Sequence, residues 1–281
     1  MIPNKDITFK FFDYKWKVVP NWAAGTQEIY RDWYLKRYGY ETLDNLKEFL
    51  KDKKCILEAG CGIARDSKMF AELKDDALIV AMDQSENALK AAKEYLAEFK
   101  NCEIIRADIT NFEYPRKFDF ISCDQVIHHT PVPGDTLKHF FDNLNFNGII
   151  NFSVCKKKNK IRDSVDEAIF EKAAKMEPRQ LWKFAETVTK FGKDLYDLNI
   201  EKDGENLQRF VHNNSFRCWY NPDVDYDLCV SSNYDWFSGN PLFNLEEVGE
   251  MIKGLNGYYE YKILRIYEDF ATINVSIQRV S

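Results

Sequence analysis

Short apolar runs alternate with amphipathic segments through the middle of the chain. The runs with the length of buried strands are Cys55–Leu57, Ala77–Met82, Cys102–Ala107, Phe118–Cys123 and Ile149–Val154. Between them, the helical spacing of apolar residues predicts a helix that begins near Arg65 and further helices over Ala88–Phe99 and Thr136–Leu144. Strands that alternate with helices in this way predict an α/β fold.

The two ends of the chain have other patterns. Residues Met1–Lys17 mix aromatic and polar residues, which predicts an irregular or stranded arm. Apolar positions over Gln27–Lys51 fit two helices broken near Gly39. The C-terminal part has the pattern of a helix over Leu245–Leu255 and then of strands around Tyr259–Tyr267 and Phe270–Arg279.

The most specific stretch is CILEAGCGIARDSKM at Cys55–Met69. Gly60 and Gly62 allow a tight turn and a close approach to a ligand, because no Cβ blocks either. The helix that follows directs its N-terminal N–H groups at such a ligand. A dinucleotide-binding fingerprint would need a third glycine three residues after the second, and Arg65 stands there instead.

Two acidic residues complete the motif. Glu58 lies two residues before Gly60, and Asp83 ends the run Ala77–Met82. With these residues the chain resembles the class I S-adenosylmethionine-dependent methyltransferases of the small-molecule type, whose first motif reads acidic-x-Gly-x-Gly-x-Gly. Ala64 takes the place of the last glycine. The resemblance implies a Rossmann-like, seven-stranded α/β sheet flanked by helices, and S-adenosylmethionine as the cofactor.

The resemblance also implies a domain plan. Residues 1–50 would form an N-terminal arm and helical cap, and residues 51–155 and 243–281 the cofactor-binding domain. Residues 156–242 would be a large insertion after strand five that acts as a lid or recognises the substrate, because an insertion at the carboxyl end of a strand lies beside the active site. Candidates for a cap over the cofactor are Trp22, Tyr30, Arg31, Trp33 and Arg37, with packing or a solvated helix face as the alternative.

The family assigns cofactor contacts to particular residues. Glu58 would hold the methionine ammonium, and Asp83 the ribose hydroxyls, for which a carboxylate is a natural bidentate acceptor. Asp108 and the backbone of Ile109 would meet the adenine. The complete candidate set is Glu58, Gly60, Gly62, Arg65, Asp83, Gln84, Asp108, Ile109 and Asp124. As purely structural alternatives, Asp83 could cap the next helix and Asp108 the turn that follows it.

The segment DQVIHHTPVP follows the run Phe118–Cys123. Ligands of open α/β sheets bind at the carboxyl ends of the strands, so this segment should lie where cofactor and acceptor meet. His128 or His129 could take a proton from the acceptor, or could serve packing or cofactor contact. We favour His129, since it is further from the strand and next to Thr130.

The second half of the insertion, Phe216–Phe243, is rich in aromatic residues and turns. Its candidates for contact with a polar small molecule are Trp219, Tyr220, Asn221, Tyr234, Asp235 and Trp236. These residues could equally form the core of the insertion. The basic run Lys156–Arg162 either binds a phosphate or carboxylate or is a solvated loop.

Composition narrows the function further. A net charge of −6 disfavours a nucleic-acid partner. The odd number of cysteines, seven, predicts reduced thiols and a cytoplasmic protein. No cysteine pair has zinc-site spacing, so we expect no metal site. We also expect no membrane partner, since no apolar run reaches spanning length. A homodimer stays open.

We therefore predict an enzyme that transfers the methyl group of S-adenosylmethionine to O or N of a small polar molecule, such as a sugar, an amino acid or a natural-product intermediate. One alternative keeps the cofactor but performs non-methyl transfer or intramolecular alkylation. Nucleic-acid methylation is disfavoured because the acidic-Pro-Pro-aromatic motif is missing. A non-catalytic homologue and a nicotinamide oxidoreductase are less favoured possibilities.

Overall fold

The structure is a computed structural model that describes residues 5–19, 27–239 and 241–280. The chain divides into two compact units. The sheet unit comprises Ala23–Lys156 and Leu242–Ser281, and the helical unit comprises Pro3–Trp22 and Lys157–Pro241. Trp22, one of the cap candidates, lies outside the described residues.

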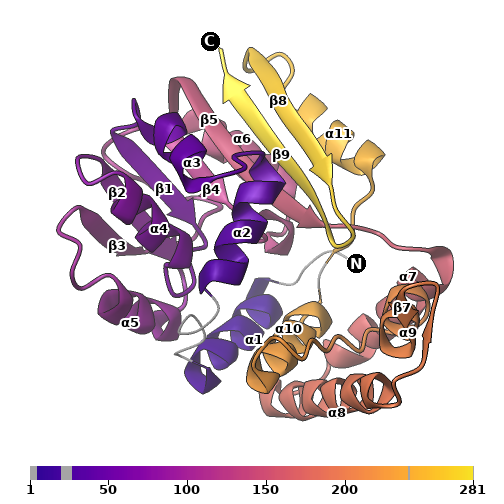
Figure 1. Cartoon of the computed structure of the whole chain (residues 1–281). Coiled ribbons are helices and arrows are strands. Elements are labelled where there is room, and N and C mark those ends of the chain that lie inside the picture. The colour runs from indigo at the N-terminus through magenta and orange to yellow at the C-terminus, as the bar shows by residue number, and fades with distance from the viewer. Residues whose placement is uncertain (1–4, 20–26, 240, 281) are drawn as a thin grey trace. The chain divides into compact units, whose positions relative to one another are not determined.

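The sheet unit contains a seven-stranded sheet with the order β3-β2-β1-β4-β5-β9-β8 (Figure 1). Its strands are β1 Cys55–Ala59, β2 Leu78–Asp83, β3 Cys102–Arg106, β4 Phe118–Cys123, β5 Leu144–Cys155, β8 Tyr261–Glu268 and β9 Thr272–Arg279. Strands β1 to β5 are parallel, and β9 pairs antiparallel with both β5 and β8. The predicted Rossmann-like sheet is confirmed.

Helices cover both faces of this sheet (Figure 1). They are α2 Gln27–Tyr38, α3 Leu43–Leu50, α4 Arg65–Leu73, α5 Glu86–Tyr95, α6 Pro133–Asp142 and α11 Leu245–Lys253. Leu137 and Ile252 pack with one apolar cluster of the sheet, and Tyr34 and Phe70 with another. Because both faces are covered, β1 is buried at every residue, which explains its continuous apolar run.

The helical unit consists of α1 Lys5–Val18, α7 Lys160–Ala173, α8 Pro178–Asp197, α9 Leu207–Asn214 and α10 Tyr226–Phe237, with a short hairpin of β6 Glu201–Lys202 and β7 Glu205–Asn206. The predicted irregular or stranded arm is wrong from Lys5 onward, because this segment is α1. Thr8, Phe11 and Lys15 are its buried positions and have helical spacing. Aromatic residues on its other faces obscure that period.

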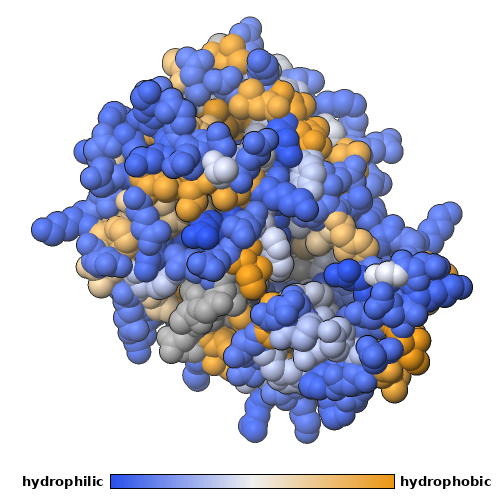
Figure 2. Space-filling view, viewed as in Figure 1, coloured by the Kyte–Doolittle hydropathy of each residue, from blue (hydrophilic) through white to orange (hydrophobic). Residues whose placement is uncertain are grey.

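Within the described ranges, no helix combines the length and the apolar character that crossing a membrane requires. The face in Figure 2 is mostly hydrophilic, with separate apolar areas. No disulfide joins any of the seven cysteines, all of which lie in described segments.

Candidate active site

The glycine loop between β1 and α4 has a left-handed backbone at three positions. The φ angles are +76° at Gly60, +54° at Gly62 and +64° at Ala64. Ala64 therefore adopts the conformation that the expected last glycine would take more easily. The N–H groups of Gly60 and Cys61 both donate to the carbonyl oxygen of Met82 at 2.8 Å, which ties the loop to the end of β2.

Gly60 also has no room for a side chain. A Cβ there would lie 2.3 Å from Cγ1 of Val126. We expect Gly60→Ala to lower the free energy of unfolding by about 2–5 kcal/mol, from a left-handed backbone (about 1–2 kcal/mol) and overpacking (about 1–3 kcal/mol). Urea denaturation would measure this change.

Gly257→Ala is the matched control. Gly257 has a similar φ of +81°, but a Cβ there would have no atom of the described residues within 4 Å. It should therefore show only the backbone cost, about 1–2 kcal/mol. Adding Val126→Ala to Gly60→Ala should restore part of the lost stability. Equal losses in Gly60→Ala and Gly257→Ala would show that the contact with Val126 is unimportant.

Asp83 joins two loops at the carboxyl ends of β1 and β2. Its Oδ2 accepts a hydrogen bond from the Gly62 N–H at 2.9 Å, and its Oδ1 accepts one from the Ser85 N–H at 2.8 Å. Ser85, rather than Asp83, caps α5 by accepting from the Ala88 N–H. Gln84 is half-buried beside it. The helix-cap alternative for Asp83 is thus replaced by a role in fixing the glycine loop.

Asp108 and Ile109 follow β3, the next strand of the sheet. The Asp108 carboxylate accepts a hydrogen bond from the Thr110 N–H at 3.0 Å, and the Ile109 side chain is buried. Asp108 thus caps the local turn, while its position at the strand end agrees with the predicted adenine contact. That contact stays a prediction.

Glu58 is a buried carboxylate at the end of β1. Its Oε2 accepts hydrogen bonds from both the N–H and the hydroxyl of Ser67, near the start of α4. Burial, and next the nearby Asp66 carboxylate, raise the pKa of Glu58 to about 8, although the bonds from Ser67 lower it. Arg65 donates to Asp66 at 3.0 Å, and its guanidinium lies 4.2 Å from the centre of the Tyr30 ring. Because the pKa of Glu58 is raised, a further cation beside it would stabilise its ionised form.

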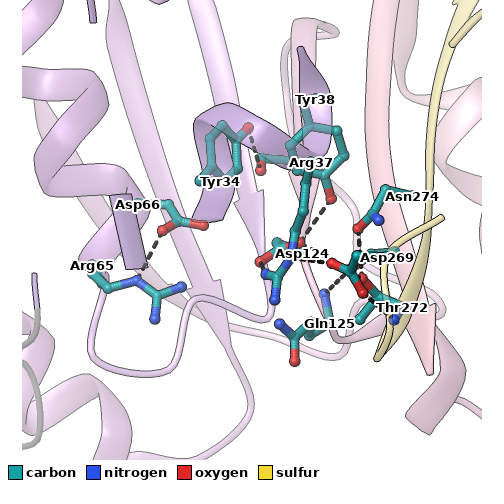
Figure 3. Close-up of polar contacts among 12 residues, drawn as sticks. Tyr34, Arg37, Tyr38, Arg65, Asp66, Asp124, Gln125, Asp269, Thr272 and Asn274 are labelled. Carbon is teal, nitrogen blue, oxygen red and sulfur yellow. Dashed lines mark hydrogen bonds and ion pairs between the residues drawn. The ribbon is translucent and has the colours of Figure 1, made fainter. Parts of the chain in front are cut away.

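Asp124, directly after β4, is held by three protein donors. Its carboxylate accepts from Arg37 Nη1 at 2.7 Å and from the Tyr38 hydroxyl at 2.8 Å (Figure 3). It also accepts from Ser153 Oγ at 2.8 Å. Its side chain is 3% exposed. Ser153 Oγ in turn accepts from the N–H of Gln125, whose φ is +57°. Asp124 thus ties α2 to β4 and β5, and the cofactor contact predicted for it stays a prediction.

The two histidines lie in a short 3-10 helix, η1 Ile127–His129. His128 is buried, its Nε2 is 3.4 Å from Sγ of Cys155, and burial lowers the pKa of its ring to about 4. Its ring is therefore neutral at pH 7. His129 is half-buried, with its ring centre 4.1 Å from that of His128. Of the two, His129 is the more accessible to an acceptor.

The predicted substrate residues of the insertion lie within the helical unit. Tyr234 is fully buried and its hydroxyl donates to the Phe11 carbonyl at 2.9 Å, while Asp235 pairs with Lys15 at 2.5 Å. Trp236 is 4% exposed. For these three residues, the alternative that they build the core of the insertion accounts for their positions.

Trp219, Tyr220 and Asn221 precede α10 and are half-buried. The N–H of Trp219 donates to Oδ1 of Asn233 at 3.1 Å, which fixes this segment against α10. The Tyr220 ring packs at the edge of Tyr196, 5.6 Å between centres. Substrate contact by these three residues stays a prediction.

Comparisons with known proteins agree with this geometry. The family described as a methyltransferase domain matches residues 50–214, more than half of the chain. The chain is 28% identical to the mitochondrial ubiquinone biosynthesis O-methyltransferase of Schizosaccharomyces pombe over 124 residues, which is 41% of this chain and 44% of the relative. It is 24% identical to malonyl-[acyl-carrier protein] O-methyltransferase 1 of Ilyobacter polytropus over 153 residues, or 54% and 57% of the two chains.

Among solved structures, the plantazolicin methyltransferase BamL in complex with a triazolic desmethylPZN analog and SAH has a TM-score of 0.55 at 10% identity, with 99% of this chain and 98% of that chain covered. This likeness shows the shared fold. The chain spans about half the length of the curated relatives that it matches. It belongs to the methyltransferase-domain family, and within it to the class I S-adenosylmethionine-dependent methyltransferases.

The cofactor of this family is S-adenosylmethionine, and the residues present fit it. The raised pKa of the buried Glu58 carboxylate suits a neighbouring ammonium group. The close approach that glycine permits at Gly60 and Gly62, and the position of Asp83 beside them, suit the ribose.

This fit predicts a pH dependence of binding. S-adenosylhomocysteine carries the same ammonium group, which favours ionised Glu58. The affinity should therefore rise with pH between about 6.5 and 8, by up to about tenfold per unit when one proton is released. Calorimetry across this range would measure the rise, and Glu58→Gln should abolish most of it. A flat profile for the parent protein would contradict the assignment.

The stability of the ligand-free protein should follow the opposite trend. The pKa of Glu58 is higher in the folded chain, about 8, than in an unfolded one, about 4.3. Folding is therefore favoured by protonated Glu58, and this contribution is fully present below about pH 4.3, decreases as the pH rises, and is lost above about 8.

Proposed function

We propose that the chain transfers the methyl group of S-adenosylmethionine to an oxygen of a small polar molecule. The observation that carries the proposal is the convergence at one edge of the sheet of the glycine loop after β1, Asp83 after β2 and η1 after β4. These strands are parallel neighbours, so their carboxyl ends meet at that edge. Oxygen is favoured over nitrogen because the curated relatives named above are O-methyltransferases.

Methyl transfer requires no covalent intermediate with the protein. When bound, the cofactor supplies a methyl group activated by a sulfonium. Glu58 would hold the ammonium and Asp83 the ribose diol, so that the acceptor oxygen can be aligned at about 3–3.5 Å from the methyl carbon. His129 would accept the proton of the acceptor hydroxyl on an unprotonated ring nitrogen.

We propose that the insertion, residues 156–242, recognises the methyl acceptor. It leaves the sheet unit at the carboxyl end of β5 and returns there, since the Phe243 N–H donates to the Cys155 carbonyl at 2.8 Å and Lys156 forms a bridge with Phe243. Strand β5 is the parallel neighbour of β4, which leads to η1. This position supports recognition of the acceptor by residues 156–242.

The test is incubation with methyl-labelled S-adenosylmethionine and a panel of hydroxylated sugars, amino acids and phenols. Label in a product and matching release of S-adenosylhomocysteine would support the proposal. Methylthioadenosine as the by-product would point instead to transfer of another part of the cofactor. Failure to bind S-adenosylhomocysteine would overturn the proposed function.

A further inference from the structure

Basic side chains surround one indole ring in the helical unit. The ring centre of Trp236, on α10, lies 4.7 Å from the Arg217 guanidinium, 5.5 Å from that of Arg162 and 5.7 Å from Nζ of Lys158. Arg162 lies on α7, which packs against both α9 and α10. We refer to Lys158, Arg162, Arg217 and Trp236 as the basic cluster.

Arg162 forms the buried part of the cluster. Its side chain is fully buried, its Nε donates to Asp166 Oδ2 at 2.8 Å, and its Nη1 donates to the His212 carbonyl. Its Nη2 has no hydrogen-bond partner among the residues that the structure describes. A buried charged group that lacks a partner is costly, and such groups in native proteins often mark the place of an ion or ligand.

Lys158 and Arg217 form the accessible part. Both are half-buried, whereas Arg162 is not exposed at all. Arg217 donates from Nε to Asn233 Oδ1 at 3.1 Å and from Nη2 to Ser232 Oγ at 2.8 Å. Both partners lie on α10, so these contacts fix the guanidinium against that helix. A fixed guanidinium loses little conformational freedom when it binds an anion.

His212 lies beside the cluster. Its ring is buried, and burial is the first cause that lowers the pKa of the ring to about 2, followed by the charges of Arg217, Arg162, Lys158 and Arg209. The ring therefore stays neutral beside these cations.

We propose that the basic cluster binds an oxyanion, either a carboxylate or a phosphate. Guanidinium groups match carboxylate and phosphate oxygens in geometry as well as charge. The cluster also gives the basic run Lys156–Arg162 a binding role in place of a solvated loop.

Anion binding can be measured directly by titrating the full chain with inorganic phosphate and, separately, with benzoate at constant ionic strength. We expect saturable binding of at least one of them, weakened tenfold or more in Arg217→Gln and in Lys158→Gln. Arg179→Gln is the matched control, since Arg179 is an exposed cation on α8 of the same unit and does not belong to the cluster. No saturable binding, or equal loss in Arg179→Gln and Arg217→Gln, would overturn the site.

Discussion

Asp83→Ala is expected to weaken the binding of S-adenosylhomocysteine by about 1.5–3 kcal/mol, or roughly 10- to 150-fold, the usual worth of a hydrogen bond to a charged group. The variant removes the charged acceptor proposed for the ribose diol. It also removes the bond from the Gly62 N–H to Oδ2, which fixes the glycine loop. Both losses act in the same direction. Calorimetric titration would give the affinity.

Asp83→Asn separates the two contributions. Its amide oxygen can still accept from one backbone N–H, either that of Gly62 or that of Ser85, but it lacks the charge. An intermediate loss is therefore expected. Circular dichroism must show that both variants are folded. If folded Asp83→Ala binds S-adenosylhomocysteine as tightly as the parent, Asp83 does not hold the ribose.

The sheet and the glycine loop could be predicted because their signals are local. Burial on both faces of a parallel sheet makes each strand a continuous apolar run, as in β1 and β2. The loop needs glycine where the backbone is left-handed, and Gly60 and Gly62 appear in the sequence directly. Ala64 shows the limit of this rule, since it adopts the same conformation without being glycine.

The contacts by which α2 holds Asp124 beside the candidate site could not be predicted in the same way. Arg37 and Asp124 are 87 positions apart, and their ion pair depends on how α2 packs, which no local pattern encodes. The sequence does place Tyr34, Arg37 and Tyr38 on one helix face, and that face contacts β4. Its role is recognisable only once the strand is known to lie there.

The roles of the aromatic residues in the insertion could not be assigned for another reason. An aromatic residue such as Tyr234 looks the same in the sequence whether it stacks on a ligand or packs in a core. Its complete burial and its bond to the Phe11 carbonyl depend on α1, a helix whose period is hidden by its many aromatic side chains.

His129→Gln is expected to lower the rate of methyl transfer by about 10²–10⁴-fold with the affinity for S-adenosylhomocysteine nearly intact, because glutamine can form a hydrogen bond but cannot take the proton. His128→Gln is the natural comparison. His128 is buried against Cys155, so its substitution should chiefly affect stability. Single-turnover rates and urea denaturation of both variants would separate these effects.

The pH profile of the parent enzyme distinguishes the two rings as well. The protonated form of a base is inactive, so the rate falls as the pH drops through its pKa. An unperturbed imidazole has a pKa of about 6.5, whereas burial lowers the pKa of His128 to about 4. A fall near pH 6–7 that disappears in His129→Gln would identify His129 as the base, and a fall only near pH 4 would point to His128. If both Gln variants keep rates within a few-fold of the parent across this range, neither histidine removes the proton, and alignment of donor and acceptor alone carries the reaction.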